Sequence, residues 1–152
     1  MDSKQKPENG FSLEIPTPAI NLLPHRGTML LVDELVDFHA ASGRGRVRAR
    51  DLNESPFVAR DGFLEEVVLI EMLAQAYACV RGYEDLKAGR PIGPGFLVGI
   101  RRWHRQTKAT TKDKLIIEIA TTAVIGDFFL AEGKVFTSEN LVAGGELKLW
   151  AP

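Results

Sequence analysis

Hydrophobic residues are concentrated in the middle of the chain, where residues 67–80 are apolar on nearly every side of a helix. A helix that is hydrophobic all round lies in the interior of a fold rather than on its surface. The pattern therefore predicts a buried helix over about residues 64–81. We expect Gly82 to end it, because glycine commonly follows the last turn of a helix. Residues 83–94, with their glycines and prolines, are expected to form a loop.

The segments on both sides of this helix follow the patterns of β-strands. Residues 44–50 alternate between arginine and small or apolar side chains, which is typical of a half-exposed strand. Gly126 and Asp127 lie between two apolar segments and predict a tight hairpin turn. Strands are expected over residues 29–38, 44–50, 95–103, 115–124, 127–137 and 141–150. This order predicts an α+β fold in which a curved antiparallel sheet wraps around one long central helix.

Length and composition narrow the class of protein. The 152 residues predict one domain over residues 11–152, after a flexible tail of residues 1–10. A formal net charge of -1 favours neither a nucleic-acid binder nor a membrane-surface protein. No apolar run reaches the roughly 18 residues of a membrane span. With a single cysteine and no signal peptide, the expected location is the cytoplasm.

Two polar residues interrupt the apolar helix. Glu71 and Gln75 are four positions apart, so they share one stripe of the helix. A carboxylate on a buried helix must be neutral, paired or open to a cavity. The cavity interpretation makes Glu71 a candidate acid or base, and a buried structural carboxylate is the alternative. Gln75 could orient Glu71 through a hydrogen bond, or it could satisfy a backbone group.

The other candidate residues carry weaker signals. No pair or trio of His, Cys and acidic residues has metal-ligand spacing, so we expect neither a metal nor a cofactor. Cys79 lies in the apolar run without a nearby histidine, which favours a core thiol. His39 and His104 are expected at the surface.

Three stretches, in this order, resemble the hot-dog superfamily and, within it, the β-hydroxyacyl-(acyl carrier protein) dehydratases. Residues 23–33 resemble the N-terminal signature of these dehydratases. Residues 69–76 resemble their central helix, with its acidic residue and the following glutamine. Residues 96–100, followed by a basic stretch, resemble the strand after that helix. Together the stretches cover most of residues 23–149.

The resemblance implies a reaction and partners. Its family removes water reversibly from 3-hydroxyacyl thioesters, with one group taking the proton next to the thioester and another helping hydroxide to leave. It implies an acyl carrier protein or coenzyme A thioester as the ligand, in fatty-acid or polyketide-like lipid synthesis. It also implies a homodimer, or a higher oligomer of dimers, whose sheets join edge to edge around an acyl tunnel. No nucleic acid or membrane is implied.

The resemblance also assigns residues. It implies that Glu71 is catalytic and that Gln75 supports it, with His25 as a candidate partner or, alternatively, a structural residue. Substrate contacts are implied for Phe57, Glu66, Val67, Phe96, Leu97, Val98 and Gly99. Phe57 occupies the position, fourteen residues before the helix carboxylate, where the family has its catalytic histidine. This departure leaves two alternatives to a dehydratase open, a non-catalytic subunit that binds an acyl carrier or a partner, and an acyl thioesterase.

Two basic segments complete the set of candidate surfaces. One consists of the arginines of residues 44–50, and the other of Arg101, Arg102, Arg105 and Lys108. The first could attract an acidic carrier protein or a nucleotide, and the second an acidic carrier protein or the phosphates of coenzyme A. A solvated sheet face explains both segments equally simply.

Overall fold

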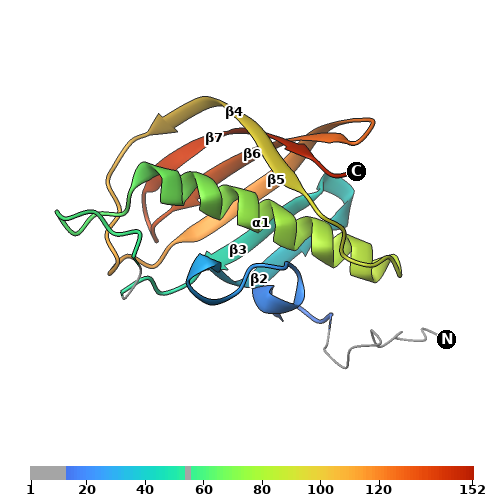
Figure 1. The fold of residues 1–152 in the computed structure, drawn as a ribbon, viewed down its shortest axis with the longest axis horizontal. Coiled ribbons are helices and arrows are strands. Elements are labelled where there is room, and N and C mark those ends of the chain that lie inside the picture. The colour runs from blue at the N-terminus through green and yellow to red at the C-terminus, as the bar shows by residue number, and fades with distance from the viewer. Residues whose placement is uncertain (1–12, 54–55) are drawn as a thin grey trace.

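One long helix lies across the concave face of a seven-stranded antiparallel sheet (Figure 1). The computed structural model describes residues 13–53 and 56–152, so the predicted tail of residues 1–10 lies outside the described residues. The helix is α1 (Glu66–Lys87). The strands are β1 (Thr17–Pro18), β2 (Val32–His39), β3 (Arg44–Ala49), β4 (Phe96–Arg105), β5 (Ile116–Ile125), β6 (Phe128–Phe136) and β7 (Leu141–Trp150).

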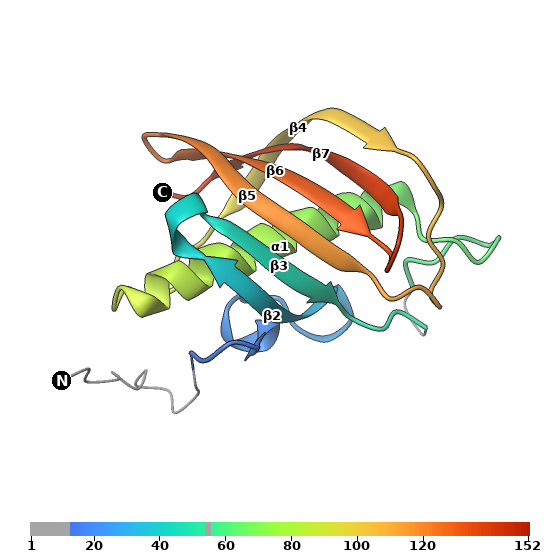
Figure 2. The ribbon, with the colours of Figure 1, turned by 180° about the vertical axis from the view of Figure 1, so that it is seen from behind.

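The sheet has the strand order β1-β2-β3-β5-β6-β7-β4, so β4 forms one of its edges. Every pair of neighbouring strands is antiparallel. Seen from behind, the strands cross in front of α1 and curve around it (Figure 2). The predicted α+β architecture, a curved antiparallel sheet around one central helix, is therefore confirmed.

The helix is longer than predicted. Gly82 lies inside α1, which continues to Lys87, so the prediction that the helix ends at Gly82 was wrong. A Cβ atom at Gly82 would lie 2.1 Å from the carbonyl oxygen of Leu22, so this glycine allows the N-terminal segment to approach the helix closely. Glu66 in the first turn and Lys87 in the last turn complement the helix dipole.

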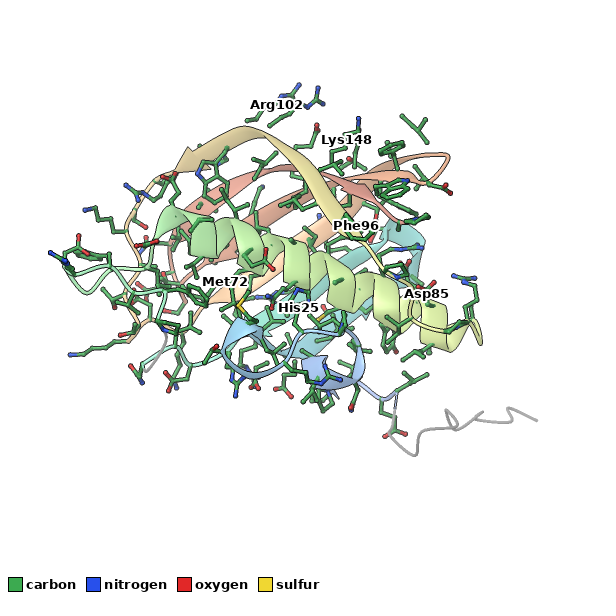
Figure 3. All side chains as sticks on the ribbon, viewed as in Figure 1. His25, Met72, Asp85, Phe96, Arg102 and Lys148 are labelled. Carbon is green, nitrogen blue, oxygen red and sulfur yellow. The ribbon has the colours of Figure 1, made fainter. Side chains whose placement is uncertain are left out.

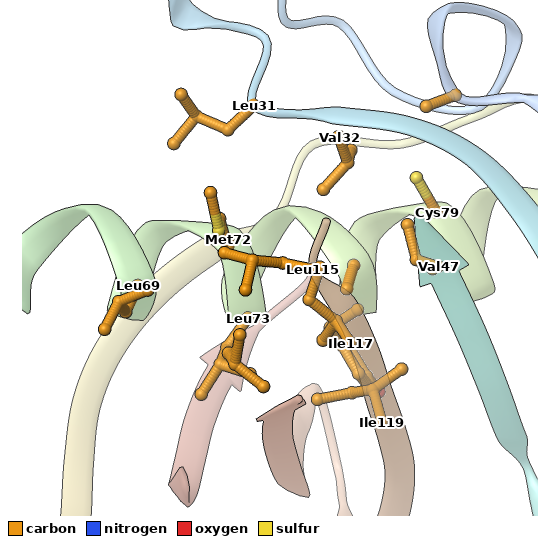
Figure 4. Packing of buried hydrophobic residues seen from close by; sticks show 14 of the residues in the cluster. Leu31, Val32, Val47, Leu69, Met72, Leu73, Cys79, Leu115, Ile117 and Ile119 are labelled. Carbon is orange, nitrogen blue, oxygen red and sulfur yellow. The ribbon is translucent and has the colours of Figure 1, made fainter. Parts of the chain in front are cut away.

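The core lies between α1 and the sheet (Figure 4). From the helix it receives Leu69, Met72, Leu73, Ala76 and Val80, and from the sheet Val47, Ile117, Ile119, Ala131 and Leu147, all almost completely buried. Burying each of the larger side chains contributes about 1.5–3 kcal/mol. Cys79 also lies in this core, and burial raises the pKa of its thiol, which confirms the predicted core thiol.

The strand predictions hold with small shifts at the ends. The last strand has the predicted bounds, and Gly126 and Asp127 form the predicted turn, with Gly126 at a positive φ of 61°. In β3 the arginines are exposed and the residues between them are buried or half-buried, as the alternation indicated. The clearest difference is at residues 27–29, where a 3-10 turn (Gly27–Met29) replaces the expected start of β2.

Candidate functional site

Glu71 lies on the wall of a cavity of about 460 Å³ beside α1. Its side chain is 37% exposed, so the carboxylate is open to this space rather than sealed in the core. Of the possibilities for a carboxylate on an apolar helix, opening to a cavity is one that the structure shows, and the partners described next are another. Such a position allows Glu71 to contact a ligand.

Gln75 connects Glu71 to the N-terminal segment. Its amide nitrogen donates to Glu71 Oε1 at 3.1 Å and to the carbonyl oxygen of Met29 at 2.7 Å. Its amide oxygen accepts from the backbone N–H of Leu31 at 2.8 Å. The side chain is completely buried. Both roles suggested for Gln75 are thus present, because it orients the carboxylate and satisfies two backbone groups at the 3-10 turn.

His25 comes from the N-terminal segment and lies next to Glu71 on the cavity wall. Its Nε2 atom lies 3.5 Å from Glu71 Oε1. Its Nδ1 atom is buried and has no hydrogen-bond partner among the described residues. The Arg26 guanidinium donates to the carbonyl oxygens of Leu23 and His25, which holds this segment in place. Figure 3 shows His25 next to α1.

The cavity follows one face of α1. Small residues at helical spacing, Ala74, Ala78 and Gly82, lie along it beyond Glu71. Apolar side chains of the N-terminal segment and of the sheet also line the cavity, among them Leu22, Leu23, Leu97 and Leu149. Further along α1 from Glu71, the lining includes the charged residues Arg81, Asp85 and Arg90, together with residues 91–95 of the loop after the helix.

Of the substrate-contacting residues implied by the resemblance, only Leu97 lines this cavity in the single chain. Phe57 packs against the core, and the Glu66 carboxylate accepts a hydrogen bond from the Trp103 indole. Val67 is exposed at the start of α1. The remaining three, Phe96, Val98 and Gly99, lie on the edge strand outside the lining.

The alternation of side chains along β4 explains the part of this division that separates Leu97 from Phe96 and Val98. Phe96 pairs with Trp150 in the ladder, and the centroids of their rings are 5.6 Å apart. Leu97 pairs with Leu149, which also lines the cavity. Neighbouring residues of a strand face opposite sides of a sheet. A strand can therefore offer only part of the stretch from Phe96 to Gly99 to one cavity.

Sequence reasoning missed several lining residues. Arg81 and Asp85 continue the steps of three and four residues that run from Glu71 through Ala74 and Ala78, so the period of the helix could have identified them. Tyr77 lies at the margin of this helix face. Burial is the main cause that raises the pKa of the Tyr77 phenol. Arg90, in the loop after the helix, carries no comparable signal in the sequence.

The described residues contain no group of three or more His, Cys, Asp and Glu side chains placed to hold a metal ion. Within the same ranges, no helix is both long and apolar enough to cross a membrane.

The chain is similar to curated dehydratases. It is 30% identical to the 3-hydroxyacyl-[acyl-carrier-protein] dehydratase FabZ of Syntrophomonas wolfei over 138 residues, which is 88% of this chain and 94% of the relative. A FabZ of Natranaerobius thermophilus is 30% identical over 129 residues, 83% of this chain and 89% of the relative.

Solved structures share its fold. The dehydratase heterocomplex ApeI:P from Xenorhabdus doucetiae contains a chain that matches with a TM-score of 0.81 at 23% identity, covering 90% of this chain and 91% of that one. The protein smu.793 from Streptococcus mutans, bound to acetyl CoA, matches with a TM-score of 0.66 at 13% identity, covering 87% and 97%. The family described as ApeP-like, ApeP dehydratase, matches residues 17–152. The chain is a dehydratase-like protein of the hot-dog fold and belongs to the ApeP-like dehydratase family.

Proposed function

We propose that this protein removes water from 3-hydroxyacyl thioesters carried by an acyl carrier protein or by coenzyme A. The observation that carries the proposal is the pairing of Glu71 with His25, 3.5 Å apart, on the wall of the cavity. The fatty-acid dehydratases that the chain resembles act on acyl carrier protein substrates according to their names, and the fold neighbour smu.793 binds acetyl CoA.

The proposed chemistry needs one base and one acid. The imidazole of His25 takes the proton from the carbon next to the thioester carbonyl, and Glu71 in its protonated form gives a proton to the 3-hydroxyl. The carbon–oxygen bond then breaks, a carbon–carbon double bond forms, and water leaves. Gln75 keeps the Glu71 carboxyl in position through its 3.1 Å hydrogen bond. In this scheme His25 supplies, from the same chain, the histidine that is missing at position 57.

Product analysis tests the proposal. The purified protein is incubated separately with a 3-hydroxyacyl thioester and with a saturated acyl thioester of the same carrier. A dehydratase converts the first to the 2-enoyl thioester and leaves the second intact. Release of free thiol from either would instead make the protein a thioesterase. Binding of both without any product would favour a non-catalytic role.

A second candidate function is that of a partner subunit. Phe57 stands where the related dehydratases carry histidine, and one fold neighbour is part of a dehydratase heterocomplex. The free edge of β4 presents backbone groups that could pair with a second sheet. Along β4 and the loop that follows it lie Arg101, Arg102, Arg105 and Lys108, which could contact an acidic carrier protein.

Mass measurement in solution separates the two arrangements. A homodimer, as predicted from the sequence, has twice the mass of one chain and works alone. A subunit of a heterocomplex gains dehydratase activity only when a second hot-dog protein is added that has histidine where this chain has Phe57. Assembly as a homodimer and location in the cytoplasm stay predictions.

A further inference from the structure

The cavity changes character along its length, from a reactive pair at one end to a charged group at the other. Glu71 and Asp85 both line it and are 14 positions apart on α1. At a rise of about 1.5 Å per residue, the two ends are separated by about 21 Å along the helix. The part between them is mainly apolar, and Figure 3 shows Asp85 further along α1 than His25.

Arg90 is held at this charged end by Asp85. Its Nε and Nη2 atoms donate to Asp85 Oδ1 at 3.1 and 3.0 Å, and its backbone N–H donates to the Asp85 carbonyl oxygen at 2.8 Å. A guanidinium group has five N–H donors, and those two bonds leave others available. The side chain of Arg90 is 59% exposed, so these donors are accessible from solvent.

Arg81 adds a second guanidinium to the same end. It lies 3.8 Å from Asp85, 3.3 Å from Glu84 and 4.3 Å from the centre of the Phe129 ring. Of the charged residues that line this end of the cavity, two are therefore cationic and one, Asp85, is anionic. Glu84 pairs with Arg81 from outside the lining. An apolar ligand tail would gain little from such a wall, whereas an anionic oxygen would find oriented donors.

Acyl carrier protein and coenzyme A thioesters share one anionic group, a phosphate, which the same flexible arm joins to the thioester sulfur. Between the thioester sulfur and the phosphate lies the pantetheine arm, which contains two amide units and spans about 16 Å when extended, given peptide-like bond lengths. Arg81 is ten positions after Glu71 on α1, which corresponds to about 15 Å along the helix. The extended arm is therefore long enough to reach from Glu71 to the level of Arg81.

We propose that Arg90, supported by Arg81, binds the phosphate of the phosphopantetheine arm when the thioester lies at Glu71 and His25. This inference rests on the proposed function for the position of the thioester. It assigns phosphate binding to the loop after α1 rather than to the basic stretch of residues 101–108, none of which lines this cavity. The arm would cover the small residues Ala74 and Ala78.

Binding measurements with unreactive analogues test the assignment without requiring turnover. The probes are S-alkyl pantetheine and S-alkyl 4′-phosphopantetheine, which differ only in the phosphate and are compared by calorimetry. The wild-type protein is expected to bind the phosphorylated probe about tenfold more tightly or better, the usual effect of hydrogen bonds to a charged group. Arg90→Ala is expected to remove most of this preference.

The decisive quantity is the preference for the phosphorylated probe, that is, the ratio of the affinities for the two probes, rather than either affinity alone. A variant in which the loop is only loosened would bind both probes more weakly by the same factor, so its preference for the phosphorylated probe would be unchanged. Arg46→Ala, on the sheet, where Arg46 faces Glu118 at 3.5 Å, is the matched control and should keep the preference too. Equal binding of the two probes by the wild type, or an unchanged preference in Arg90→Ala, would overturn the assignment. A clear preference in a protein that turns over no thioester would retain the phosphate subsite and reject the dehydratase function.

Discussion

His25 Nε2 lies 3.5 Å from Glu71 Oε1, although one residue belongs to the N-terminal segment and the other to the central helix. The pair places an imidazole and a carboxylate on one cavity wall within a single chain. We propose this pair as the acid and base of a family member that has phenylalanine at position 57.

We expect His25→Ala to lower kcat for dehydration by at least about tenfold, because general acid–base groups contribute at least that much. Thermal unfolding should change little, because the ring is partly exposed and its Nδ1 atom has no partner among the described residues. Steady-state kinetics and a thermal melt measure both quantities. His39→Ala, at the exposed end of β2, should leave kcat unchanged. Loss of stability with full kcat would assign His25 a structural role instead.

Replacing Gln75 with leucine should lower the free energy of unfolding. The substitution removes the partner of the buried Leu31 N–H, and also that of the carbonyl oxygen of Met29, which is an exposed residue. An orphaned buried group costs about 1–3 kcal/mol, so the free energy of unfolding should fall by about 1–3 kcal/mol. Urea denaturation measures it. Exposed Gln106 offers a control, and Gln106→Leu should change stability by less than about 0.5 kcal/mol. A fall of that small size for Gln75→Leu would contradict the bonding described for its side chain.

Gly82→Ala should destabilise the fold even though alanine favours helices. The new methyl group would lie 2.1 Å from the Leu22 carbonyl oxygen and would push the N-terminal segment away from α1. We expect a loss of about 1–3 kcal/mol, typical of overpacking, in a denaturation experiment. Gly93→Ala, where a Cβ has no neighbour within 4 Å, is the matched control. If the two variants were equally stable, the close approach of Leu22 to the helix would be refuted.

Glu84 should make stability depend on pH. Burial raises the pKa of its carboxyl above the usual 4.5, more than the neighbouring Arg81 lowers it. The folded state therefore holds this proton more tightly than the unfolded state, and stability declines as pH rises from about 4.5 through the folded-state pKa. In Glu84→Gln the side chain at this position does not ionise. The stability of this variant relative to the wild type should increase between about pH 4 and pH 7, as measured by urea denaturation. A relative stability that stays constant or decreases over this range would contradict the raised pKa.

The architecture could be predicted from the sequence because the patterns of apolar and polar residues are periodic. The apolar run around Glu71 and the alternation in residues 44–50 each have a single structural interpretation over several turns or residues. The end of the helix was mispredicted because glycine serves two purposes. At Gly82 it makes room for Leu22 instead of ending the helix.

The site was only partly predictable because its contacts join distant segments. Glu71 and Gln75 follow from their positions on one helix. The position of His25 depends on a segment whose 3-10 turn is fixed by hydrogen bonds from the Gln75 side chain, and no local pattern encodes those bonds. The contribution of Arg90 likewise depends on its bonds to Asp85. Among residues 96–99, the alternation along the strand separates Leu97, which lines the cavity, from Phe96 and Val98, and the ladder is irregular between Leu97 and Gly99.

The most direct test of the account is the rate of dehydration by Glu71→Gln. Glutamine keeps the size of the side chain and can still bond to Gln75, but it cannot donate and accept the proton that the chemistry requires. Dehydration of a 3-hydroxyacyl thioester is followed by the absorbance of the 2-enoyl product, with Glu132→Gln, at an exposed position on β6, as the control. The account predicts that kcat falls by about a hundredfold or more in Glu71→Gln while the control keeps full activity. Unchanged kcat in a folded Glu71→Gln protein would contradict it.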